Sequence, residues 1–147
     1  MRLGLLVVVA IVAIFSITAC GATHKSAVGG KVTVRIALGN NGQDESNGGV
    51  SGRGHFTATG AIVDRGSATT YRTVKGSIPG GVITLRIVTV GKKGAITYLV
   101  TIDTGTGTSR WKVSSGTKAY DGVHAHGVER ENAAHTTGTL IGTVSTS

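Results

Sequence analysis

The sequence has few cysteine, aromatic and acidic residues. A single cysteine among 147 residues excludes an internal disulfide. Aromatic residues form 4% of the chain, too few to stack a series of bases, and the basic residues are scattered. Both features argue against a nucleic-acid-binding protein. Seven Asp and Glu face 15 Lys and Arg, so few carboxylates are available for general acid–base chemistry.

Long runs without glycine are also missing. After Cys20 no such run exceeds ten residues, whereas a typical helix has about 11–12 residues and an internal glycine costs close to 1 kcal/mol. Threonine, valine and isoleucine fill the intervals, and these β-branched residues favour pleated strands. The composition therefore predicts an all-β domain.

One long apolar segment stands at the N-terminus. It follows the positive charge of Arg2, and residues 3–17 carry no charge. This run is shorter than the roughly 20 residues that cross a bilayer as a helix. A positive start, a short apolar stretch and small residues at its end are typical of a signal peptide. We therefore interpret residues 1–19 as a cleaved signal peptide rather than as a transmembrane anchor.

The end of this segment, Ile17-Thr18-Ala19-Cys20, resembles the lipobox of bacterial lipoprotein precursors. The resemblance implies that lipid is attached to the Cys20 sulfur and that Cys20 becomes the first residue of the mature chain. Two or more acyl chains hold a protein stably on a membrane. Gly21-Ala22 replace the acidic residues that retain some lipoproteins at the inner membrane. The sequence predicts an exported protein, lipid-anchored to the outer face of the cell membrane or to the outer membrane of a two-membrane cell.

The mature chain is predicted to be a short tether followed by one domain. Residues 20–30 are small and polar, as in a flexible linker, and residues 31–147 are enough for one core. Residues 39–54 are expected to form a long loop, and residues 115–127 an irregular segment. Alternation of apolar and polar residues predicts about eight strands, at 31–38, 55–64, 68–75, 82–90, 95–102, 109–114, 127–131 and 137–145. We expect them to form a single small antiparallel β-barrel, because closure removes exposed strand edges.

Three stretches carry a resemblance to a group of uncharacterised secreted bacterial proteins. They are GRGHFTATGAIVDRG, KGSIPGGVITLRI and WKVSSGTKAYDGVHAHG, within residues 52–142. This group looks related to the barrels of allene oxide cyclase and dirigent proteins, which bind apolar or phenolic substrates in the barrel mouth. The resemblance implies the barrel fold and, as an alternative function, a site for a small apolar ligand. It carries no catalytic residue over to this chain.

The charge balance bears on partners. Without residues 1–19 the chain keeps 14 of its 15 Lys and Arg and all seven acidic residues, a net charge of +7. Such a balance favours contact with anionic envelope polymer or lipid. The alternative is that single cations merely keep exposed strand faces soluble.

Two groups of residues are candidate sites. Arg110 and Trp111, with Tyr120, would form a cation-flanked aromatic platform for a ligand; alternatively Trp111 belongs to the core and Tyr120 caps the barrel. His124 and His126 would share one side of a strand and reach one metal ion, with His55 or His135 completing the set. The alternative is that these histidines are exposed and bind no metal.

Nothing in the sequence points to catalysis or to a cofactor. There is no G-x-S-x-G turn, and the only thiol is assigned to lipid. Glu129 and Glu131 share a strand face, but Arg130 stands between them and no acid–base role follows. We therefore expect a non-enzymatic binding or interaction protein.

Overall fold

The computed structural model describes residues 29–39, 48–133 and 136–146; Cys20 and the predicted signal peptide and lipobox lie outside them. About three quarters of the described residues belong to strands, which confirms the predicted all-β fold. Among the described residues, no helix is long and apolar enough to span a membrane. The elements are β1 (Gly30–Gly39), β2 (Val50–Gly60), β3 (Asp64–Lys75), β4 (Val82–Gly91), β5 (Ala95–Asp103), β6 (Thr108–Gly116), the 3₁₀ turn η1 (Lys118–Tyr120), β7 (Val123–Glu131) and β8 (Thr137–Thr146).

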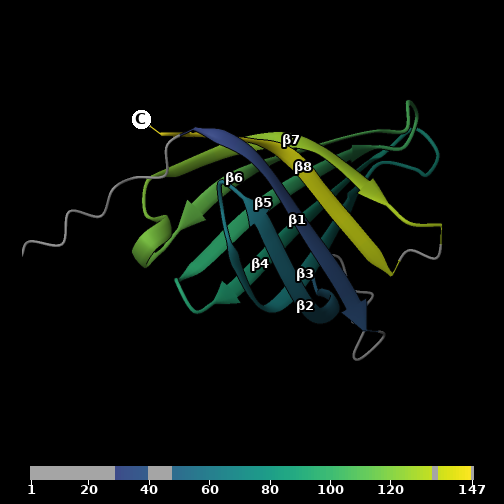
Figure 1. The fold of residues 1–147 in the computed structure, drawn as a ribbon. Coiled ribbons are helices and arrows are strands. Elements are labelled where there is room, and N and C mark those ends of the chain that lie inside the picture. The colour runs from purple at the N-terminus through teal and green to yellow at the C-terminus, as the bar shows by residue number, and fades with distance from the viewer. Residues whose placement is uncertain (1–28, 40–47, 134–135, 147) are drawn as a thin grey trace, which may run out of the picture.

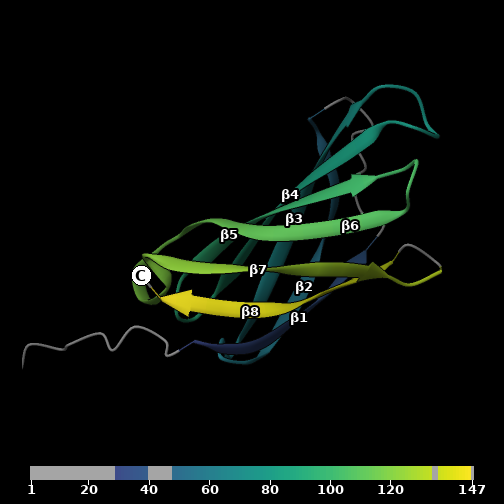
Figure 2. The ribbon, with the colours of Figure 1, turned by 90° about the horizontal axis from the view of Figure 1, so that it is seen from above.

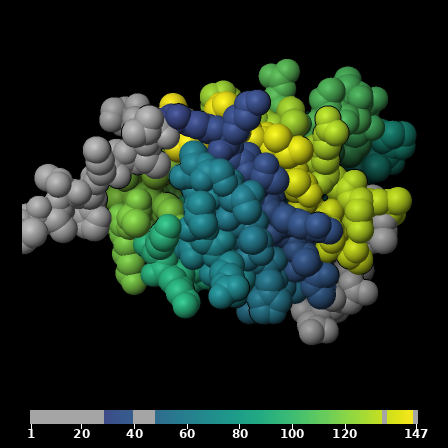
Figure 3. Space-filling view, in the orientation of Figure 1, coloured from purple at the N-terminus to yellow at the C-terminus, as the bar shows by residue number. Residues whose placement is uncertain are grey.

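The strands form a closed barrel in chain order. Each strand pairs antiparallel with the next, and β8 pairs with β1, so that Val34 lies opposite both Ala58 and Leu140. Figures 1 and 2 show this arrangement from two sides, and Figure 3 shows the outer surface where β1 lies between β2 and β8. The predicted eight-stranded antiparallel barrel is confirmed. Because the barrel closes within residues 30–146, a chain that starts at Gly21 contains the complete fold.

Alternate residues of each strand point into the barrel, as the pleat of a β-strand requires. Val32, Val34 and Ile36 of β1 are buried, whereas Lys31, Thr33 and Arg35 between them are exposed. The same alternation on the other strands fills the interior with apolar side chains. The largest fully buried ones are Tyr98, Ile36, Ile96 and Leu140.

Several predicted strand limits were wrong. β2 ends at Gly60 and β3 begins at Asp64, where one strand was expected to run to residue 64 and the next to begin at residue 68. Two strands also begin earlier than predicted, in both cases because of glycine. β2 begins at Val50 and β7 at Val123, inside segments that were expected to be irregular. A Cβ on Gly54 would overlap the Ala37 carbonyl, and one on Gly127 would overlap the Ile141 carbonyl. These glycines therefore allow neighbouring strands to approach closely instead of ending a strand.

The two ends of the barrel differ. At the end that holds the turn at 61–63, the loop at 92–94 and η1, Tyr120 is buried among the core residues. We call this the capped end. At the other end, which holds the loops at 76–81 and 104–107, inward apolar side chains stay partly exposed. We call this the open end, and its partly exposed side chains are Leu38, Val74, Ile83, Leu85 and Ile102.

Candidate functional site

Trp111 of β6 lies inside the barrel and is buried. Its Nε1 donates to the Val128 carbonyl at 3.0 Å and to the Ile141 carbonyl at 3.2 Å. Its ring meets that of Tyr98 edge to face, with 5.7 Å between centroids. A Cβ on Gly142 would come within 2.6 Å of Trp111 Cζ2, so this glycine leaves the space that the indole fills. The indole has the surroundings of a core residue and is not exposed as the face of a platform.

Tyr120 closes the capped end through a polar contact. Its hydroxyl donates to Asp64 Oδ2 at 2.8 Å. The backbone amides of Arg65, Lys92 and Lys93 donate to the same carboxylate at 2.8, 3.2 and 3.2 Å. Gly91 leaves room for it, since a Cβ there would overlap the carboxylate. With Tyr120 and Trp111 both buried, the predicted platform residues do not form one exposed surface with Arg110.

These bonds shift the pKa of both side chains at the capped end. Burial alone would raise the pKa of Asp64, but the hydrogen bonds from Tyr120 and from three amides outweigh it, and the pKa falls below its ordinary value. For Tyr120, burial raises the pKa, and the bond to the Asp64 carboxylate raises it further. The contact is therefore between an ionised carboxylate and a neutral phenol, which makes it a charge-assisted hydrogen bond.

His124 and His126 both lie on the outer face of β7 and are exposed, on the same side as expected for alternate residues of a strand. Their register neighbours are Ser145 on β8 for His124, and Lys112 and Thr143 for His126. His135 lies outside the described residues. No group of three or more His, Cys, Asp or Glu that could hold a metal ion occurs within the described part of the chain.

The outer wall of the barrel carries mainly positive charge, although one further cation, Arg72, occupies an inward register position opposite Leu85. Asp64, Glu129 and Glu131 occupy inward register positions, in line with Ala58, Leu140 and Gly138. Asp103, at the end of β5, is the only acidic residue at an outward strand position among the described residues. The outward positions of six strands carry exposed cations: Lys31, Arg35, Arg53, Arg65, Lys75, Arg86, Arg110, Lys112 and Arg130.

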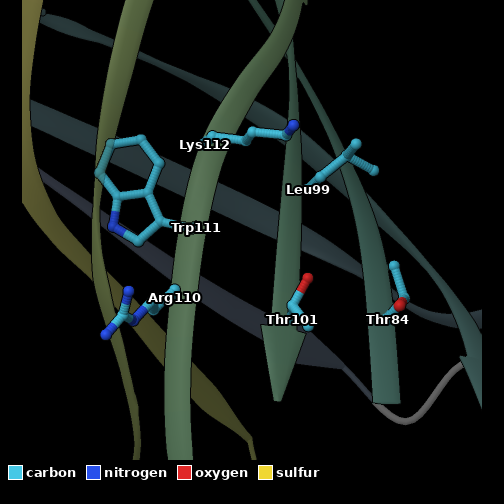
Figure 4. A pocket seen from close by; sticks show the side chains of 6 residues that line it. All are labelled: Thr84, Leu99, Thr101, Arg110, Trp111 and Lys112. Atoms are coloured by element: carbon cyan, nitrogen blue, oxygen red, sulfur yellow. The ribbon is translucent and has the colours of Figure 1, made fainter. Parts of the chain in front are cut away.

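A groove of about 330 Å³ crosses this wall on β4, β5 and β6. Arg110 lies opposite Thr101, which lies opposite Thr84, and in the next row Lys112 lies opposite Leu99. Figure 4 shows Lys112 extending toward Leu99 on one side of the β6 ribbon and the Trp111 ring on the other. We call this the β4–β6 groove, lined by Thr84, Leu99, Thr101, Arg110, Trp111 and Lys112. Of the three predicted platform residues, it includes Arg110 and Trp111 but not Tyr120.

Arg86 lies beside this groove, opposite Leu99 on the same row as Lys112. Its guanidinium carbon lies 3.8 Å from the centroid of the Tyr71 ring on β3. A guanidinium over an aromatic face is attracted to it, so this contact orients Arg86 and leaves its N–H groups for other acceptors. Arg86 was not singled out from the sequence, because the register that places it beside the groove joins separate strands.

The open end holds a half-buried carboxylate. Glu129 Oε2 accepts a hydrogen bond from Ser109 Oγ at 2.9 Å. Burial raises the pKa of Glu129, the hydrogen bond from Ser109 opposes this rise, and the negative charge of Glu131 adds a smaller increase. The sequence showed that the two glutamates share a face but not that this face is the barrel interior.

The interior also contains two hydroxyls without hydrogen-bond partners in the described structure, those of Thr70 and Tyr98. They lie in one row, because Thr70 is opposite Ile87 and Ile87 is opposite Tyr98. Burial raises the pKa of Tyr98 to about 12. An unpaired buried hydroxyl costs about 1–3 kcal/mol, so Thr70 reduces the stability that the apolar core provides. The cost at Tyr98 is smaller, because the Thr89 side chain interacts with its hydroxyl and partly opposes the effect of burial on its pKa.

Comparison with known proteins gives no match. No protein-family model matches the sequence, and neither curated proteins nor solved structures show significant similarity to it. The function must therefore be inferred from the barrel's own residues.

Proposed function

We propose that this protein is an exported lipoprotein, anchored through Cys20, whose cationic barrel wall binds anionic polymer of the cell envelope without catalysing a reaction. The observation that carries the proposal is the mainly positive charge of the wall. Nine exposed Lys and Arg point outward from six strands, with Asp103 as the only acidic residue at an outward strand position among the described residues. Such a surface attracts polyanions at long range.

The distribution of the cations favours a polymer over a membrane surface as the partner. Arg53 of β2 and Arg110 of β6 are four strands apart in an eight-stranded ring, so they lie on opposite sides. A flat bilayer meets one side of a cylinder, whereas flexible chains contact it all round. A lipid anchor at the N-terminus would hold the barrel within such a layer.

The wall is tested with the chain that starts at Gly21, which lacks the anchor. We expect it to bind linear polyphosphate at low ionic strength. Binding should weaken steeply as salt is added, because cations that neutralise a polyanion release its counterions. Fluorescence anisotropy of labelled polyphosphate measures this. A parallel assay measures binding to vesicles of phosphatidylglycerol. If the chain binds these vesicles and not polyphosphate, the partner of the wall is an anionic lipid surface instead of a polymer. Binding to neither would overturn the proposed role of the wall.

The anchor is tested separately in the full-length chain. We expect Cys20→Ala to accumulate as an unacylated precursor that keeps residues 1–19, because the lipobox lacks its acceptor sulfur. Mass spectrometry of the protein extracted from its own membrane measures both the acylation and the cleavage. Ala22→Ser, two residues beyond the cysteine, is the control and should be processed normally. An acylated Cys20→Ala protein would refute the assignment of Cys20.

A second candidate function is binding of a small apolar ligand at the open end. Its support is the set of partly exposed inward apolar side chains at the open end, together with the half-buried carboxylate of Glu129 on β7. Glu131 and Arg72 also occupy inward register positions toward this end, so such a site would combine apolar walls with a few polar groups that fix orientation. A small molecule that stays bound in native mass spectrometry would favour this function over polymer binding.

A further inference from the structure

We propose that the β4–β6 groove is the site where one stretch of a phosphate-bearing chain docks on the barrel, with Arg110 and Lys112 binding its phosphates. This inference rests on the proposed function and adds a location and a ligand chemistry to it. Elsewhere on the wall, cations would contribute only diffuse attraction. In the groove, charge, hydroxyl groups and an apolar surface occur together.

Both cations occupy outward positions of β6, and their side chains extend to opposite sides of the β6 ribbon (Figure 4). Residues two apart on a strand face one way and lie about 7 Å apart, so Arg110 and Lys112 line the groove together. Both are exposed, and their cross-strand neighbours on β5 and β7 are Thr101, Leu99, His126 and Val128, none of which is acidic. Their positive charge is therefore not neutralised by a cross-strand partner.

The other lining residues suit a phosphate-bearing chain. The hydroxyls of Thr84 and Thr101 lie in register with Arg110 and add donors that a phosphate, with several acceptor oxygens, is able to use. Leu99 lines the groove between Lys112 and Arg86. Across Leu99, the backbone of Arg86 is two strands from that of Lys112, or about 10 Å, and the Arg86 guanidinium lies over Tyr71 on β3, on the side away from Leu99. Arg86 would therefore meet a phosphate farther along the chain.

The test compares two double variants of the chain that starts at Gly21. Arg110→Gln with Lys112→Gln empties the groove of charge, and we expect it to weaken polyphosphate binding about tenfold. Arg53→Gln with Arg65→Gln removes the same charge from β2 and β3, where both arginines are exposed. We expect the affinity of this matched variant for polyphosphate to fall by about threefold at most, because only the diffuse attraction is reduced. Circular dichroism and thermal unfolding show that both barrels remain folded.

Thr101→Glu is an independent probe of the groove. Thr101 is exposed on the outer face of β5, so a glutamate fits there without disturbing the core. Its carboxylate would repel phosphate, and we expect the affinity for polyphosphate to fall at least about tenfold. Thr57→Glu, at an exposed outward position of β2, makes the same change of charge away from the groove and should have a smaller effect.

The outcomes separate the groove from the wall. Equal losses in groove variants and matched variants would overturn the groove and leave the cationic wall as a diffuse polyanion surface. If the unmodified chain fails to bind polyphosphate, the proposed function itself fails. Inorganic phosphate and unlabelled polyphosphate are also compared as competitors of labelled polyphosphate. If both compete equally well at the same molar concentration, the groove does not bind an extended chain.

Discussion

Replacing Trp111 with alanine is expected to lower the free energy of unfolding by about 3–5 kcal/mol. The indole is buried, meets the Tyr98 ring edge to face, and donates to two strand carbonyls. Alanine removes all three contributions and leaves a cavity where β6, β7 and β8 meet. Urea denaturation followed by far-ultraviolet circular dichroism measures the change. Trp111→Phe should cost less than alanine, because it keeps an aromatic ring and loses the two hydrogen bonds.

The space that the indole fills depends on Gly142, so a substitution at Gly142 also tests the packing of Trp111. A Cβ there would overlap the His126 carbonyl and come within 2.6 Å of Trp111 Cζ2. We therefore expect Gly142→Ala to cost about 1–3 kcal/mol, the usual range for overpacking. Gly138, four residues earlier on β8, is the control, because its Cβ would meet Glu129 Oε1 at an ordinary 3.5 Å. Equal stabilities of the two glycine variants would show that Trp111 does not pack on Gly142.

Trp111 also illustrates how far the sequence predicts the fold. Composition and the alternation of apolar and polar residues can be read without knowing the fold, and they predicted the all-β class and about eight strands respectively. The alternation failed at the starts of β2 and β7, where Gly54 and Gly127 resemble turn residues. Their role is to admit the carbonyls of Ala37 and Ile141, and those contacts exist only once distant strands have paired.

The candidate site was less predictable than the fold, for the same reason. Arg110 was selected from its neighbours in the sequence, but the groove depends on register across three strands, which places Thr84, Thr101 and Arg110 in one row. Tyr120 was grouped with Trp111 from sequence proximity. Its hydrogen-bond partner is instead Asp64, 56 residues away. The sequence shows which side chains of a strand share a face. It does not show which side chains of other strands lie next to them in the barrel.

The positive charge of the outer wall follows from the alternation along each strand together with the closure of the barrel. Along the sequence the cations are scattered, and Lys92-Lys93 is the only adjacent pair. Once the barrel closes, alternation directs Arg35, Arg86 and Lys112 outward, while Asp64 and Glu129 occupy inward positions near the two ends. Cations that are scattered along the sequence therefore gather on the outer surface of the folded barrel, which is mainly positive. This wall is the basis for proposing an anionic partner.

At the capped end, Asp64→Ala is expected to lower the free energy of unfolding by about 1–2 kcal/mol at neutral pH. The carboxylate accepts four hydrogen bonds, and its partial exposure keeps their net value modest. Its pKa in the folded protein lies below the ordinary value of 3.8. The stability that it contributes is therefore fully present above that value and is lost as pH falls through the folded pKa.

Urea denaturation at pH 7 and at pH 3 measures this dependence. The unmodified barrel should lose stability between the two conditions, and Asp64→Asn should lose less, because its side chain does not titrate. Tyr120→Phe, which removes the donor at 2.8 Å, should fall between them. Asp121→Asn is the matched control: it removes a charge from an exposed side chain next to Tyr120 and should retain the acid sensitivity of the unmodified protein. Equal acid sensitivity in Asp64→Asn and Asp121→Asn would show that the capping carboxylate does not control the stability of the barrel in acid.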